Sequence, residues 1–160
     1  MKKKNVKPAL YAAIALLALL GAAVFFGYVP VLANECRVMY PELAHLYWPG
    51  LGFCWWIALL CYGMLFMFGS VVRRVSGGRS FCGENARAFR RLGALALVAA
   101  VSMPAPLAFF AVVREDCGPI VVLLSIAGFL GFLVVALLAF PLAGLVDQAA
   151  GIQAENELTI

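Results

Sequence analysis

The chain has 160 residues, of which 65% are hydrophobic and 12% are charged, and its formal net charge is +4. An ordinary soluble domain is about 45–50% apolar and about a quarter charged, so a water-soluble globule of this size could not cover so much apolar surface. Intrinsic disorder is excluded as well, because disordered chains are polar and rich in charge.

Four stretches without Lys, Arg, Asp or Glu follow one another along the chain, at residues 9–29, 51–72, 92–113 and 119–146. Each is long enough to cross a hydrocarbon core, which takes about 20 apolar residues in a helix. Lipid leaves exposed backbone groups unsatisfied, and the alternating segments of a β-barrel are missing. We therefore predict a single all-α domain, an integral membrane bundle of four transmembrane helices with up-down connectivity.

Prolines and glycines support this partition. Pro30 and the pair Pro49-Gly50 flank a first loop at residues 30–50, and Gly77-Gly78 breaks the second connection. Proline inside a helix removes a backbone hydrogen bond and bends the helix. We therefore expect kinks within the third and fourth spans, at Pro104, Pro106 and Pro141.

Basic residues are distributed unevenly between the two sides of the predicted bundle. Four lysines precede the first span and six arginines lie in the 73–91 loop, whereas the other side holds only Arg37 and Arg114. The positive-inside rule therefore predicts that both termini, the 73–91 loop and the 147–160 tail are cytoplasmic. Residues 30–50 and 114–118 are predicted to face outward.

The N-terminus also allows another interpretation. Lysines at 2–4, an apolar stretch and Val31-Leu32-Ala33 resemble a secretory signal that would be cleaved before Asn34. A signal core has about 7–15 residues, fewer than the stretch at 9–29, so an uncleaved anchor is favoured. The intact mass of the mature chain distinguishes the two.

The cysteines occupy different environments. Cys36 and Cys117 lie in the two outward loops, where an oxidising exterior permits a disulfide, and they are the candidate pair. The alternative is two free thiols too far apart to bridge. Cys54 and Cys61 share one face of the second span without a C-x-x-C motif, so they are predicted to pack as small hydrophobes.

Nothing else in the sequence indicates an enzyme, a cofactor or a metal site. His45 and Glu42 could share a helix face, but two ligands do not make a metal site, and a plain interfacial histidine is favoured. No ionisable residue lies inside a span, which argues against a pump or an ion-coupled transporter. Small-residue patterns such as Ala18-x-x-x-Ala22 and Ala127-x-x-x-Gly131 fit helix packing within one chain or in a homo-oligomer.

The predicted cytoplasmic side carries opposite charges in two segments. Residues 73–91 hold six arginines against one glutamate, and the tail at 147–160 holds three acids and no base. The basic loop fits attraction to anionic lipid, pairing with the acidic tail, or docking of a soluble partner. Direct binding of nucleic acid is the least favoured interpretation. Gly83-Glu84-Asn85 fits a helix start, with an acid in the first turn.

Three segments of the chain are distinctive: the closing QAENELTI, Tyr40-Pro41-x-Leu43 in the first loop, and Ser80-Phe81 leading to Glu84-Asn85. They resemble a bacterial four-span membrane family known as domain of unknown function 2975, in whose closing motif Asp is more frequent than the Glu157 found here. The resemblance implies a multi-pass protein of the bacterial inner membrane without established enzymatic activity. Its genes often neighbour one for a small Cro/CI-type helix-turn-helix regulator, which implies a membrane protein that binds or restrains such a partner.

Three functions are therefore considered. The first is capture of a helix-turn-helix regulator through the cytoplasmic loop and tail. The second is a small-molecule or lipid binder or transporter with a cavity at the kinked third span, and the third is a structural subunit of a membrane complex. For the first, the candidate partner-binding residues are Glu84, Asn85, Arg87, Arg90, Arg91, Glu155, Asn156, Glu157 and Leu158.

Overall fold

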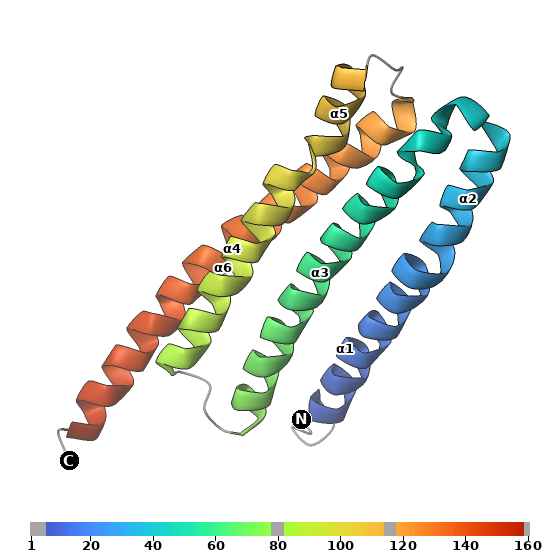
Figure 1. Cartoon of the computed structure of the whole chain (residues 1–160). Helices are drawn as coiled ribbons and strands as arrows, with labels where there is room; N and C mark the ends of the chain where they lie inside the picture. The colour runs from blue at the N-terminus through green and yellow to red at the C-terminus, as the bar shows by residue number, and fades with distance from the viewer. Residues whose placement is uncertain (1–5, 78–81, 114–117, 159–160) are drawn as a thin grey trace. The chain divides into compact units, whose positions relative to one another are not determined.

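The computed structural model describes residues 6–77, 82–113 and 118–158, and these residues form helices and turns without a strand. Four helical segments in this part of the chain are long and apolar enough to cross a membrane: Pro8–Met39, Pro41–Ser76, Gly83–Val113 and Pro119–Gln153. The predicted all-α fold with four spans is thereby confirmed (Figure 1). The chain divides into two compact units, Met1–Leu65 and Phe66–Ile160, and each is described by itself.

The first unit begins with a helix that continues past its predicted end. Helix α1 (Val6–Ala22) passes into a π-helical segment η1 (Ala23–Tyr28) and then into α2 (Val29–Met39). The structure thus differs from the loop predicted to start at Pro30. The N–H of Val29 donates to the carbonyl of Val24, five residues earlier. This wider turn accommodates Pro30, which lacks an N–H and would clash with the carbonyl of a regular α-helical turn.

A short 3₁₀ segment η2 (Pro41–Leu46) leads into the long helix α3 (Tyr47–Ser76). Pro49 lies in the first turn of α3, where its missing N–H has no intrahelical acceptor to lose. The first unit is fastened by the hydroxyl of Tyr62 on α3, which donates to the carbonyl oxygen of Ala18 on α1 at 2.8 Å. Gly21 permits this approach, because a Cβ there would lie 3.2 Å from the same hydroxyl oxygen.

The second unit contains α4 (Gly83–Ser102), α5 (Ala105–Val113) and α6 (Pro119–Leu158). Helices α4 and α6 lie side by side and antiparallel (Figure 1). Small side chains fill much of their contact, and among those exposed by 3% or less are Ala96, Ala99 and Ala100 of α4 and Ala136, Ala139 and Ala143 of α6. Together with Gly93, we call these residues the alanine seam.

Large aliphatic side chains of α6 point outward instead. Leu123, Leu124, Leu137 and Leu138 are each more than 60% exposed. This distribution is typical of helices in lipid, where leucine gains nothing by leaving the hydrocarbon and close packing of small residues holds helices together. The contact between α4 and α6 therefore uses other small residues than the predicted pattern at Ala127 and Gly131, because both of these residues are exposed and a Cβ at Gly131 would meet nothing within 4 Å.

Prolines act differently in the third and fourth spans. The third span is broken between Ser102 and Ala105, where Pro104 lacks the N–H that would continue the helix, so the kink predicted there is a break between α4 and α5. The N–H of Met103 donates to the carbonyl of Ala100 at 3.0 Å and closes α4 with a tighter turn. Helix α6, in contrast, continues through Pro141 without a break.

Candidate functional site: an arginine-lined pocket

The second unit begins with about the last three turns of α3, which lead to the start of α4. Helix α3 ends at Ser76, where the N–H of Gly77 donates to the carbonyl oxygens of Arg73 and Arg74 at 3.1 and 3.0 Å. This shared hydrogen bond closes the helix at the predicted breaker. Helix α4 begins at Gly83, as the sequence indicates, and its first two turns are therefore helix within the predicted loop at 73–91.

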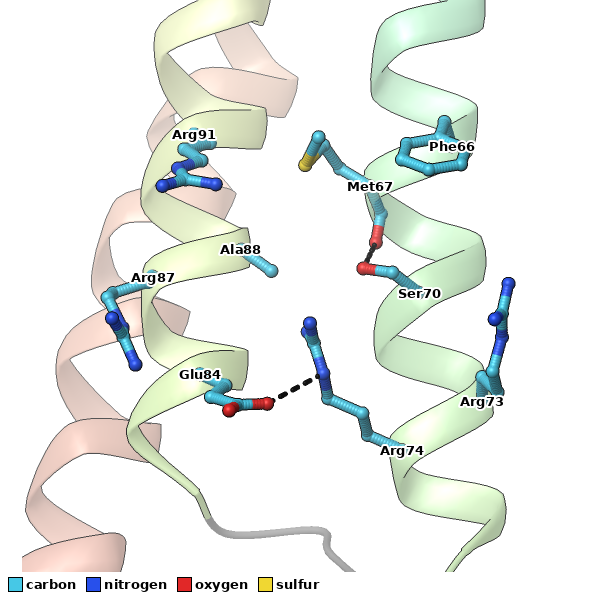
Figure 2. A pocket seen from close by; sticks show the side chains of 9 residues that line it. All are labelled: Phe66, Met67, Ser70, Arg73, Arg74, Glu84, Arg87, Ala88 and Arg91. Carbon is cyan, nitrogen blue, oxygen red and sulfur yellow. Dashed lines mark hydrogen bonds and ion pairs between the residues drawn. The ribbon is translucent and has the colours of Figure 1, made fainter.

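The end of α3 and the start of α4 enclose a pocket of about 490 Å³, all of whose lining residues belong to the second unit (Figure 2). Ligand sites in proteins commonly measure about 300–1,000 Å³. We call it the arginine pocket, and it is lined by Phe66, Met67, Ser70, Arg73, Arg74, Glu84, Arg87, Ala88 and Arg91.

An ion pair links the two helices across the arginine pocket. The Nε of Arg74 lies 3.1 Å from the Oε2 of Glu84, and Figure 2 shows the Arg74 guanidinium between α3 and α4. Glu84 lies in the first turn of α4, where a negative charge is favoured by the helix dipole. The Arg74 side chain is only 33% exposed, and its Nη1 is buried without a hydrogen-bond partner among the described residues.

The remaining charges in the pocket are positive. Arg73, Arg87 and Arg91 are exposed, and the Nε of Arg87 donates to the carbonyl oxygen of Gly83 at 3.4 Å. Four arginines therefore stand against one carboxylate. Guanidinium groups offer planar pairs of N–H donors that match the oxygens of carboxylate and phosphate, so this set of side chains can bind an anion.

The other end of the arginine pocket is apolar. Phe66 and Met67 lie about two turns before Arg74 on α3, and Ala88 faces the pocket from α4 (Figure 2). The hydroxyl of Ser70 donates to the carbonyl oxygen of Met67 at 2.7 Å, so it is satisfied within its own helix. The lining thus changes from apolar to cationic along α3.

A second ion pair lies on another side of α4. The Nη2 of Arg90 donates to the Oδ2 of Asp147 on α6 at 3.3 Å, and both side chains are more than half exposed. This contact joins a basic residue of the 73–91 segment to the first residue of the acidic tail. Exposed pairs of this kind contribute about 0.2–1 kcal/mol.

The predicted partner-binding residues fall into separate environments. Glu84, Arg87 and Arg91 line the arginine pocket, whereas Arg90 pairs with α6. Asn85 is only 1% exposed, so its side chain belongs to the packing of the second unit and not to an accessible surface.

The other four candidates form the end of α6. Glu155, Asn156, Glu157 and Leu158 continue the helix, and their side chains lie outside the part of the chain that the structure describes.

Several pocket residues are missing from the sequence prediction. Arg73 and Arg74 belong to the predicted basic loop. They lie shortly before the Gly77-Gly78 breaker and Glu84 lies shortly after it, and this arrangement was a signal for an ion pair between the two helices. Phe66, Met67 and Ser70 carry no such signal, because they lie within an uninterrupted apolar stretch.

Two further predictions concern the first unit. Cys36 is an exposed free thiol in the structure, and Cys117 lies outside the described residues, so their disulfide stays a prediction that alkylation under denaturing, non-reducing conditions tests. His45 places its Nδ1 3.0 Å from the backbone carbonyl oxygen of Glu42.

The described residues thus form a helical protein with four segments able to cross a membrane, and the arginine pocket lies where α3 ends and α4 begins. Residues 31–160 match the family described as "Protein of unknown function (DUF2975)". The chain belongs to this family, as its motifs indicate. No curated protein and no solved structure matches the chain.

Proposed function

We propose that the protein is a membrane-anchored interaction protein that binds and restrains a small Cro/CI-type helix-turn-helix regulator. The bias of its Lys and Arg residues assigns the end that carries the arginine pocket to the cytoplasm. In a bacterium the chain is then a multi-pass protein of the inner membrane. In this proposal it acts by binding and catalyses no reaction.

The observation that carries the proposal is the length of α6. The apolar stretch ends at residue 146, but the helix continues to Leu158. Helix α6 contains no Lys or Arg, so this extension carries only negative charge, at Asp147, Glu155 and Glu157. The ion pair between Asp147 and Arg90 attaches the beginning of the extension to α4.

Acids at this position are unfavourable for the helix by itself. The C-terminal end of a helix carries a partial negative charge, and an anionic side chain there costs about 0.3–1 kcal/mol. A basic partner would relieve the repulsion around Glu155 and Glu157. Helix-turn-helix proteins present such a surface, because they contact DNA phosphates with Lys and Arg. The α6 extension would therefore compete with DNA for the regulator.

The test uses the tagged full chain in native membranes. Crosslinking and mass spectrometry show whether it captures the helix-turn-helix regulator that a neighbouring gene encodes. Deletion of residues 152–160 is expected to abolish capture, and Glu155→Gln with Glu157→Gln is expected to reduce it. The matched control is Glu35→Gln with Glu42→Gln, which removes two carboxylates from the segment predicted to face outward. Unchanged capture after the deletion would overturn the proposal.

A further inference from the structure

We propose that the arginine pocket binds the phosphate group of an anionic phospholipid, with phosphatidylglycerol as the simplest ligand of this chemistry. This site is distinct from the α6 extension, and it requires no protein partner. It also differs from the cavity expected near Pro104, because it lies at the opposite end of α4.

The charge of the pocket selects an anion. Its lining contains four arginines and one carboxylate, and that carboxylate is already engaged by the Nε of Arg74 at 3.1 Å. Arg91 adds a further positive charge to the lining, whereas Figure 2 shows the Arg73 and Arg87 side chains directed away from the Arg74–Glu84 pair. A phosphodiester carries a single negative charge and two unesterified oxygens, so it fits a pair of parallel N–H donors.

Arg74 offers a hydrogen-bond donor that is available to a ligand in the pocket. Its Nη1 is buried and has no hydrogen-bond partner among the described residues. A buried donor without a partner is unfavourable, and a phosphate oxygen in the pocket would satisfy it. The ion pair with Glu84 holds the guanidinium between the helices (Figure 2).

The apolar end of the pocket favours a lipid over a free anion. Phe66 lies eight residues before Arg74 on α3, which is about 12 Å along a helix. The pocket therefore extends from the uncharged span to the first arginines beyond it. A phospholipid has the same order of groups, with acyl chains in the hydrocarbon and a phosphate at its border. Free phosphate would use only the arginine end.

The experiment uses the purified full chain in a zwitterionic detergent. Short-chain phosphatidylglycerol, phosphatidylcholine and glycerol 3-phosphate are titrated separately, and binding is followed by native mass spectrometry and by thermal unfolding. Phosphatidylglycerol is expected to bind about tenfold or more tightly than either of the others, because only it offers both a net negative charge and acyl chains. Equal binding of phosphatidylglycerol and phosphatidylcholine, or of phosphatidylglycerol and glycerol 3-phosphate, would overturn the proposal.

Two neighbouring arginines can distinguish binding at a defined site from non-specific electrostatic attraction of the lipid. Arg91→Gln removes a charge that lines the pocket, whereas Arg90→Gln removes the same charge from the adjacent residue, which pairs with Asp147. Arg91→Gln is expected to weaken phosphatidylglycerol binding by about three- to tenfold, and Arg90→Gln by less than about twofold. Equal losses in the two variants would show that bulk charge alone attracts the lipid and would refute the site.

Arg74→Gln tests the buried donor in the same way and is expected to weaken binding by about tenfold. Circular dichroism and gel filtration check that each variant is folded. If Arg74→Gln fails to fold, the comparison of Arg91→Gln with Arg90→Gln still decides, because both of these side chains are exposed.

Discussion

Helix α4 has two different neighbours within the second unit. Toward α6 it presents the alanine seam, where residues such as Ala96 and Ala143 are fully buried. Toward the end of α3 it presents Glu84, Arg87 and Arg91, and a pocket of about 490 Å³ lies between the helices. Small side chains let the backbones of α4 and α6 approach, whereas the long side chains of Arg74 and Glu84 form an ion pair across the space between α4 and α3. The two faces of one helix thus differ in the size and the charge of their residues.

The sharpest way to break the alanine seam is to enlarge Gly93. A Cβ at this position would lie 3.3 Å from the Cβ of Ala139 and 3.2 Å from the ring of Phe140. We expect Gly93→Leu to lower the free energy of unfolding in mixed detergent by about 1–3 kcal/mol, because overpacking forces the helices apart. Gly131→Leu is the matched control, since nothing lies within 4 Å of a Cβ there. A control that destabilises as much as Gly93→Leu would contradict the seam.

In the arginine pocket, in contrast to the alanine seam, one substitution is expected to strengthen an interaction, namely the binding of phosphatidylglycerol. Glu84→Gln deletes its carboxylate and releases the Nε of Arg74. We expect phosphatidylglycerol binding to tighten by about three- to tenfold, which corresponds to about 1 kcal/mol. Asp147→Asn, which removes a carboxylate outside the pocket, is expected to leave binding within about twofold of the unmodified chain. Weaker binding by Glu84→Gln would mean that the ion pair is needed to build the site.

A smaller effect is expected where the first unit is fastened by one hydrogen bond. Tyr62→Phe removes the hydroxyl that donates to Ala18 and leaves the ring in place. Hydrogen bonds between membrane helices contribute about 0.6 kcal/mol on average, so we expect a loss of that size in unfolding experiments. Tyr28→Phe removes a hydroxyl from an exposed side chain and serves as the control. A loss above about 2 kcal/mol would show that the hydroxyl does more than this bond.

The smallest effect is expected for the exposed pair that joins α4 to α6 beside the alanine seam. A double-mutant cycle with Arg90→Gln and Asp147→Asn is expected to give a coupling energy of about 0.2–1 kcal/mol that declines with added salt. Its physical reason is that water screens two side chains that are both more than half exposed. A coupling energy that does not decline at high salt would contradict this expectation and would mean that the pair is shielded from water.

Part of the candidate site was accessible from the sequence. Glu84, Arg87 and Arg91 were selected because charges beside a membrane span are conspicuous. The apolar wall was not, because Phe66 and Met67 look like any other residues of a span. Asn85 was selected with its neighbours although it is buried, since a helix start by itself does not reveal which face its partner helix covers.

The sequence by itself determined that this chain is an all-α membrane protein with four spans. Lipid cannot satisfy backbone hydrogen bonds, so uncharged stretches of sufficient length must be helices wherever they lie. Local chemistry likewise indicated the helix end at Gly77 and a kink at Pro104, where the structure has a break between α4 and α5. Only the tertiary structure decided how α1 passes Pro30, which alanines meet between α4 and α6, and that Arg74 faces Glu84. These outcomes depend on the distance between helices and on the rotation of each helix about its axis. Contacts between residues far apart in the chain determine both.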